Sequence, residues 1–169
     1  LLDRLGWNDQ LPLVSMVTRL TDQKGVDIGL GLVPFLAGAG ARFVLLGSGD
    51  AALARTATEL AGRHPDVFAF LEGYDEHKAH MLFAGSDLFL MPSRFEPCGL
   101  AQMQAMAYGS IPVATAVGGL KDTIIDDDAH PDGGTGFLAA KPTEVSVLDA
   151  LHRAIRAWRS PSRRIGLQK

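Results

Sequence analysis

Short apolar runs alternate with longer stretches of mixed polarity along the whole chain. The runs occupy residues 13–17, 42–46, 67–71, 88–91, 111–114 and, less distinctly, 136–139. Several of them are almost entirely apolar instead of alternating, as expected for parallel strands that are covered on both faces. We therefore expect a parallel sheet of about six strands.

The stretches between these runs are long enough for helices. They span residues 26–38, 51–63, 76–84, 99–108, 120–126 and 145–158. Within 99–108, Leu100, Met103 and Ala107 fall on one helical face, and Gly109 is expected to end the helix. Repeated strand–helix units predict right-handed crossovers. The predicted fold class is α/β, with a Rossmann-like parallel sheet flanked by helices in a single domain, residues 1–169.

Composition and charge narrow the class of protein. The 169 residues suffice for one domain with a sizeable core. A net charge of −3 indicates neither a nucleic-acid nor an anionic-membrane partner. The single cysteine, Cys98, excludes an intrachain disulfide and favours a reducing cytosol. No apolar run approaches the length of a membrane span, and the N-terminus lacks both Met and the layout of a signal peptide. We expect a fragment of a longer protein.

The most informative segment follows the apolar run at 88–91. It reads Pro92-Ser-Arg-Phe-Glu-Pro-Cys-Gly-Leu-Ala-Gln102, and a helix is expected to begin near Gly99. The first N–H groups of a helix have no intrahelical partner and lie at the positive end of its dipole, so they favour an anion such as phosphate. Glu96 stands just before them, where a carboxylate accepts hydrogen bonds from hydroxyls. An anion site beside a hydroxyl acceptor is what a nucleotide sugar requires.

Other candidate residues also follow strands, and ligands of open α/β sheets bind at that edge. Arg19 and Lys24 follow the first run and either converge on a diphosphate or remain solvated loop charges. Gly47-Ser-Gly-Asp50 follows the second run and predicts a tight turn with Asp50 as N-cap, beside which Ser48 contacts a nucleotide. Tyr74 follows the third run and either stacks on a base or is half-buried.

Three further features have a structural alternative to each functional interpretation. Cys98 lacks a second cysteine for a redox pair, so we interpret it as a small residue near the helix start. Gly118 and Gly119 either allow a ligand to approach closely or form a simple turn. The acidic loop fits no EF-hand, and the two histidines of 76–84 lack further ligands, so we expect no metal ion. These polar residues are Asp126, Asp127, Asp128, His130 and Asp132 in the loop, with His77 and His80 in the predicted helix.

Four motifs carry a family resemblance. Arg94-Phe-Glu-Pro-Cys-Gly-Leu100 resembles a motif of bacterial glycogen synthases and plant starch synthases, which are retaining glucosyltransferases with two facing α/β domains, the GT-B architecture. Three further stretches resemble the same family in the same order along the chain. They are Met16-Val-Thr-Arg-Leu-Thr-Asp-Gln-Lys-Gly25, Gly73-Tyr-Asp-Glu76 and Val117-Gly-Gly-Leu-Lys-Asp-Thr123. The resemblance runs from about Leu11 to Phe137, and the chain resembles the C-terminal half of such an enzyme.

The resemblance implies a role for each candidate residue. Arg19 and Lys24 correspond to residues that contact the donor phosphates, Tyr74 to a tyrosine that lies against the adenine, and Glu96 to a donor-sugar residue tied to catalysis. The implied catalytic residues are Glu96, Arg19 and Lys24. The implied nucleotide-sugar contacts add Gly47, Ser48, Tyr74, Cys98, Gly99, Leu100 and Ala101. Many family members carry Thr where this chain has Ala101, so one hydroxyl contact to phosphate is lost.

The implied reaction moves glucose from ADP-glucose to the non-reducing end of an α-1,4-glucan with retention of configuration, without cofactor or metal, in the cytoplasm or, in a plant, the plastid. The acceptor is held mainly by an N-terminal domain that this sequence lacks, so the isolated chain is expected to be inactive. Two alternatives stay open: another GT-B glycosyltransferase, acting on sucrose or lipid, and a nucleotide-binding module without catalysis. The choice between ADP-glucose and UDP-glucose also stays open.

Overall fold

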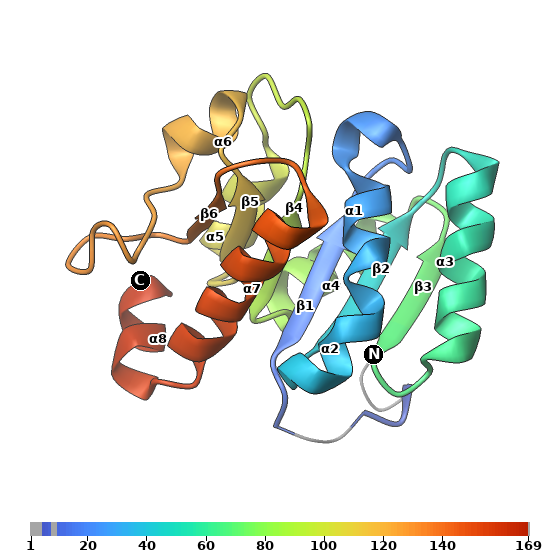
Figure 1. Cartoon of the computed structure of the whole chain (residues 1–169), viewed down its shortest axis with the longest axis horizontal. Helices are drawn as coiled ribbons and strands as arrows, with labels where there is room; N and C mark the ends of the chain where they lie inside the picture. The colour runs from blue at the N-terminus through green and yellow to red at the C-terminus, as the bar shows by residue number, and fades with distance from the viewer. Residues whose placement is uncertain (1–4, 8–9, 169) are drawn as a thin grey trace.

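Six parallel strands form one sheet in a computed structural model that describes residues 5–7 and 10–168. The strand order is β3-β2-β1-β4-β5-β6, and each neighbouring pair is parallel (Figure 1). The strands are β1 (Leu13–Val17), β2 (Arg42–Gly47), β3 (Phe68–Glu72), β4 (Leu88–Met91), β5 (Ile111–Thr115) and β6 (Phe137–Ala139). The predicted sheet is therefore confirmed, with strand ends that differ by one residue at most.

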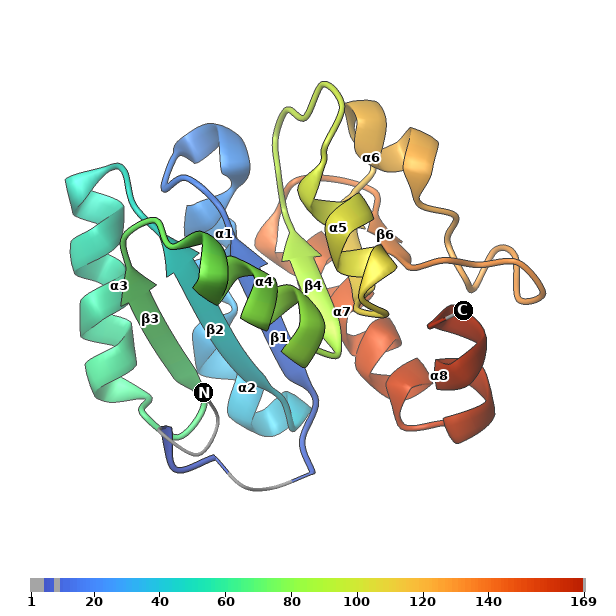
Figure 2. The ribbon, with the colours of Figure 1, turned by 180° about the vertical axis from the view of Figure 1, so that it is seen from behind.

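Helices cover both faces of this sheet and create two apolar layers. One layer packs α1 (Val26–Gly31), α2 (Val33–Ala39), α3 (Ala51–Arg63) and α7 (Glu144–Trp158) on the sheet. The opposite layer packs α4 (Glu76–Gly85), α5 (Ala101–Ala107) and α6 (Gly118–Thr123), as Figure 2 shows from behind. A short 3-10 turn, η2 (Asp22–Lys24), precedes α1, and α8 (Pro161–Leu167) follows α7. Coverage on both faces explains why β4 and β5 are buried along their whole length.

The predicted helix 26–38 is wrong as a single element, because α1 and α2 meet at Leu32. Pro34 lies in the first turn of α2 and has no N–H to donate into a continuing α1. Proline in the first turn of a helix is well tolerated, so the chain starts a new helix there. Val33 and Leu36 of α2 are buried in the core beneath this face of the sheet.

The helix predicted from Gly99 begins at Ala101 and has seven residues. Its predicted apolar face is exposed, with Leu100 68% and Met103 42% accessible, whereas Gln102 and Ala105 are buried. Residues 97–100 form a loop that includes Gly99 at φ 67°. The predicted stop at Gly109 is confirmed by its φ of 84° directly after the helix.

Two other predicted helices differ from those observed at the C-terminal side of the chain. The helix predicted at 120–126 is α6, which starts at Gly118 and ends at Thr123 because Asp126 bonds to the backbone of β6 instead. The predicted 145–158 helix is α7, and α8 was not predicted. Ser160-Pro161 before α8 is a recognisable start signal.

The strand order creates a switch point between β1 and β4. From β1 the chain proceeds to β2 and β3 on one side and then returns to β4 on the other side. Loops that leave neighbouring strands in opposite directions open a crevice at the carboxyl edge of the sheet. Figure 2 shows the loop after β1 and the loop after β4 side by side at this edge.

Candidate functional site

A buried carboxylate and a lysine meet at the switch point. The Glu96 side chain is 7% exposed, and its Oε2 lies 2.5 Å from Lys24 Nζ. Ser93 Oγ donates a second, longer hydrogen bond of 3.4 Å to the same oxygen. A buried carboxylate requires such partners, because an unpaired charge in the interior is costly. The loops after β1 and β4 therefore meet through a preassembled ion pair.

The backbone of the first loop fixes Lys24. Thr21 Oγ1 accepts a hydrogen bond from Lys24 N, and Gly25 ends the turn at φ 65°. A Cβ on Gly25 would lie 1.9 Å from the carbonyl oxygen of Pro92. Only glycine permits both this φ and this contact. Lys24 is thereby held against the loop that carries Glu96.

Arg94 ties the same two loops together on their outer side. Its guanidinium donates to both carboxylate oxygens of Asp27 at 2.7 Å and to the carbonyl oxygen of Asp22 at 2.7 Å. Its backbone N–H donates to the carbonyl oxygen of Gln23 at 2.9 Å. The hydrogen bond from Arg94 lowers the pKa of Asp27, and the same bond raises the pKa of Arg94. We call Arg94 and Asp27 the loop ion pair.

Helix α6 holds the backbone of Glu96 from the opposite side. Gly119 N–H donates to the carbonyl oxygen of Glu96 at 3.0 Å. A Cβ on Gly118 would lie 2.1 Å from that oxygen, and one on Gly119 would lie 2.2 Å from the carbonyl oxygen of Cys98. These two glycines are required by the packing of α6 on the 96–98 backbone, a third explanation beside ligand approach and a simple turn.

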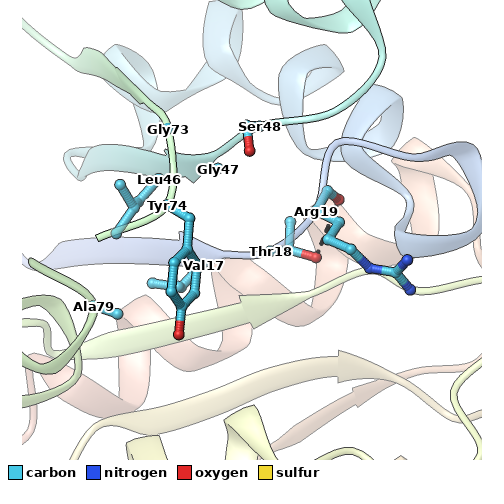
Figure 3. A pocket seen from close by; sticks show the side chains of 9 residues that line it. All are labelled: Val17, Thr18, Arg19, Leu46, Gly47, Ser48, Gly73, Tyr74 and Ala79. Carbon is cyan, nitrogen blue, oxygen red and sulfur yellow. Dashed lines mark hydrogen bonds between the residues drawn. The ribbon is translucent and has the colours of Figure 1, made fainter. Parts of the chain in front are cut away.

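A cavity of about 380 Å³ opens beside this ion pair, above the carboxyl ends of β1, β2 and β3. Figure 3 shows the Tyr74 ring on one side of it and the Arg19 guanidinium on the other. Tyr74 is 84% exposed, so the alternative of a half-buried tyrosine is wrong. The cavity is lined by Val17, Thr18, Arg19, Leu46, Gly47, Ser48, Gly73, Tyr74 and Ala79. An apolar wall with a free aromatic ring and one cation suits a planar base joined to an anion.

A smaller hollow of about 40 Å³ lies next to the cavity, on the side of Lys24. It shares Val17 and Thr18 with the cavity and also contacts Lys24, Ser93 and Ala101. The cavity and the hollow are therefore neighbours, and Lys24 links the hollow to Glu96.

The sequence-predicted residues gather at this one edge of the sheet. Arg19, Gly47, Ser48 and Tyr74 line the cavity, and Lys24 and Glu96 meet beside it. Asp50 caps α3 as predicted, since its Oδ1 accepts from the N–H groups of Ala52 and Leu53. Of the 98–101 segment, Ala101 lines the hollow, Gly99 is buried, and Cys98 and Leu100 are exposed. Cys98 lies three residues before α5 begins, in line with its interpretation as a small residue near the helix start, and it is exposed.

Several supporting residues were missed by sequence reasoning. They are Asp27, Ser93, Arg94, Gln102 and Thr123, all of which hold the loops around Glu96. Arg94 stands inside a recognised motif, yet its partner Asp27 lies 67 positions away. No local pattern marks such a pairing.

The acidic loop is neutralised by two arginines. Arg153 contacts Asp126 and Asp128, and Arg163 contacts Asp127 and Asp128, at distances of 2.5–3.1 Å. The hydrogen bond from Arg163 lowers the pKa of Asp128. Across residues 5–7 and 10–168, no group of three or more His, Cys, Asp or Glu side chains is arranged to hold a metal ion. Over the same residues, every helix falls short of the length and apolarity needed to cross a membrane.

A parallel α/β domain with its site at the switch point occurs in many enzymes, and comparison with known proteins identifies the family. The chain belongs to the glycosyl transferases group 1, whose family model matches residues 2–165. It is 49% identical over 145 residues to the glycogen synthase of Aeromonas salmonicida (strain A449), and the matched region covers 86% of this chain and 30% of that protein. It is 48% identical over 147 residues to the glycogen synthase of Halorhodospira halophila (strain DSM 244 / SL1), covering 87% and 31%. The chain therefore spans under a third of the length of these relatives.

A solved structure matches the fold over nearly the whole chain. It is the catalytic domain of starch synthase IV from Arabidopsis thaliana bound to ADP and acarbose. The TM-score is 0.89 at 36% identity, covering 98% of this chain and 36% of that one. The fold is that of a GT-B glycosyltransferase domain, and the predicted resemblance to glycogen and starch synthases is confirmed.

Proposed function

We propose that this chain is the donor-binding domain of a glycogen or starch synthase, which transfers glucose from ADP-glucose to an α-1,4-glucan. The observation that carries the proposal is the Lys24–Glu96 ion pair at the switch point, 2.5 Å between charged atoms, beside a cavity with a free tyrosine. Relatives named glycogen synthase at 49% and 48% identity support the reaction class.

Arg19 and Lys24 bind the diphosphate in this proposal. Arg19 is an exposed cation that lines the cavity, and Lys24 lines the neighbouring hollow. When the bond between the glucose C1 and the diphosphate breaks, negative charge develops on the leaving oxygen, and fixed cations stabilise it. The new bond to the glucan hydroxyl forms on the same face of the sugar.

Glu96 faces the glucose. Hydrogen bonds from Lys24 and Ser93 hold its carboxylate and fix its orientation. A preoriented carboxylate accepts hydrogen bonds from sugar hydroxyls and opposes the positive charge that develops on the ring. The lysine then lies between the carboxylate and the diphosphate.

The base occupies the cavity against Tyr74. The cavity is lined by the apolar residues Val17, Leu46 and Ala79, which together with the Tyr74 ring suit the stacking of a purine. The starch synthase IV structure that the chain matches was solved with ADP, which supports adenine as the base. Glucan contacts are assigned to the remaining length of the relatives, so we expect donor binding without transfer by this chain alone. The single cysteine favours the cytoplasm as the place of the reaction.

Calorimetry on the 169-residue chain tests the proposal. ADP-glucose and ADP should bind, and UDP-glucose should bind at least several-fold more weakly. The matched control is Arg63→Ala, which removes an exposed cation at the far end of α3 and should leave every affinity unchanged. Equal binding of all three ligands, or none, would contradict the proposed donor. Transfer of glucose by the 169-residue chain alone would contradict the assignment of acceptor contacts elsewhere.

A further inference from the structure

A buried glutamine lies beneath the loop that carries Glu96. Gln102, in the first turn of α5, has no exposed surface. Its Nε2 donates to Thr123 Oγ1 at 3.1 Å and to the carbonyl oxygen of Cys98 at 3.4 Å. The amide also packs on Gly99, where a Cβ would lie 2.4 Å from Oε1. The glutamine therefore contacts the loop from its inner side.

Thr123 extends these hydrogen bonds toward the backbone of Glu96. Thr123 Oγ1 accepts from Gln102 and donates to the carbonyl oxygen of Gly119 at 2.7 Å. The N–H of Gly119 in turn donates to the carbonyl oxygen of Glu96 at 3.0 Å. A chain of hydrogen bonds thus runs from the interior of α5 through α6 to the backbone of the residue that faces the sugar.

One side-chain atom in this series of hydrogen-bonded residues has no hydrogen-bond partner. Gln102 Oε1 is buried and accepts no hydrogen bond from any residue that the structure describes. A buried amide oxygen without a donor destabilises the fold, whereas an apolar residue of similar length would avoid that cost. The two hydrogen bonds from Nε2 are therefore made together with an unpartnered oxygen, and what these bonds hold in place calls for a functional reason.

We propose that Gln102 and Thr123 are positioning residues that set the backbone of Glu96 for recognition of the donor's glucose. Lys24 and Ser93 orient the carboxylate of Glu96, while Gln102 and Thr123 fix the position of its backbone. The inference rests on the proposed function, because it assigns Glu96 to the sugar. It predicts that losing either residue weakens glucose recognition without weakening nucleotide binding.

The test compares ADP-glucose with ADP by calorimetry on the 169-residue chain. Thr123→Val removes the hydroxyl at nearly constant volume, and Gln102→Met removes the amide at nearly constant length. Each should lower the ratio of ADP-glucose to ADP affinity by about tenfold, the effect of one misplaced polar contact, with ADP affinity within about twofold. Thr123→Ser keeps the hydroxyl and should restore the ratio.

Two measurements separate positioning from general stability. Gln102→Met removes the unpaired oxygen and also the two hydrogen bonds from Nε2, and these changes oppose each other. The variant should therefore unfold close to the wild-type temperature while it still loses sugar discrimination. Thr58→Val is the matched control, because Thr58 Oγ1 makes the same type of bond to the carbonyl oxygen of Ala54 on α3, away from the site. It should leave the affinity ratio unchanged.

Hydrogen exchange gives a result that does not depend on the ligand. In Thr123→Val, the amide of Gly119 should lose about tenfold or more of its protection, because its acceptor at Glu96 is no longer fixed. If the wild type binds ADP-glucose and both variants keep its affinity ratio, the positioning role is overturned. If the wild type fails to bind ADP-glucose, the proposed function is wrong. Separately, unchanged exchange of the Gly119 amide in Thr123→Val would overturn the positioning role.

Discussion

Lys24 Nζ and Glu96 Oε2 lie 2.5 Å apart, although the two residues are separated by 72 positions in the chain. Each residue comes from the loop after one of the two strands that flank the switch point. Because β1 and β4 are neighbours in the sheet, the loops that follow them bring the two side chains together. The pair joins the two loops that form the site, and the first two predictions act on its charges.

Replacing Lys24 by alanine should weaken ADP binding by about 1–3 kcal/mol, the range for a lost charge-assisted hydrogen bond. The loss should be measured by calorimetry at low salt, with Arg63→Ala as the control of equal charge change. An unchanged dissociation constant would show that Lys24 serves only as the partner of Glu96.

Replacing Glu96 by glutamine should leave ADP binding to this chain nearly unchanged, because Glu96 faces the glucose in the proposed function. In the full-length enzyme the same substitution should reduce kcat far more than ADP affinity. The amide keeps the size of the side chain and one acceptor oxygen but removes the charge that opposes the developing positive sugar. Normal turnover with strongly weakened ADP binding would place Glu96 on the nucleotide instead.

Replacing Gly119 by alanine should destabilise the chain by about 1–3 kcal/mol and weaken ADP-glucose binding, because the new methyl group overlaps the backbone carbonyl of Cys98. The matched control is Gly62→Ala in α3, where a Cβ meets nothing within 4 Å. That change should instead stabilise the chain by about 0.4–1 kcal/mol. Urea unfolding of both variants measures the contrast, and similar effects at the two positions would contradict the packing argument.

The loop ion pair should make stability depend on pH in the acidic range. The folded-state pKa of Asp27 is lowered from its ordinary value of 3.8, so its contribution is fully present above that value. The contribution is then lost as the pH falls through the folded-state pKa. A double-mutant cycle with Arg94→Ala and Asp27→Ala should give a coupling of about 1 kcal/mol at neutral pH, since both side chains are partly exposed. The coupling should decrease as the pH falls below 3.8 through the folded-state pKa of Asp27, and a coupling that stays constant over the acidic range would assign it to packing.

The elements that were predicted correctly are those whose own residues determine them. Strand β4 is a run of four apolar residues between two helical stretches, and its burial follows directly from that pattern. The N-cap at Asp50 depends on a contact within three residues. Helix α1 ended early because Pro34 outweighs a continuous helical pattern, and that local signal was present in the sequence.

The supporting contacts of the site were not predictable in the same way. The loop ion pair joins residues 67 positions apart, and their meeting depends on the order of strands in the sheet. In α5 the apolar pattern indicated the wrong face, because the polar Gln102 is buried beneath the 96–99 loop while Leu100 and Met103 remain exposed. Sequence periodicity ranks residues by hydrophobicity and carries no information about a buried amide that holds a loop.

Because Lys24 is paired with Glu96, Lys24 and Arg19 have different roles in the proposed function. The charge of Lys24 is already matched inside the protein, so its field is largely cancelled a few ångströms away. Arg19 forms no ion pair within the described part of the chain and stands exposed at the cavity mouth. Long-range capture of an anionic donor therefore falls to Arg19 and should diminish with ionic strength as for a single charge, while Lys24 acts only after the diphosphate has arrived.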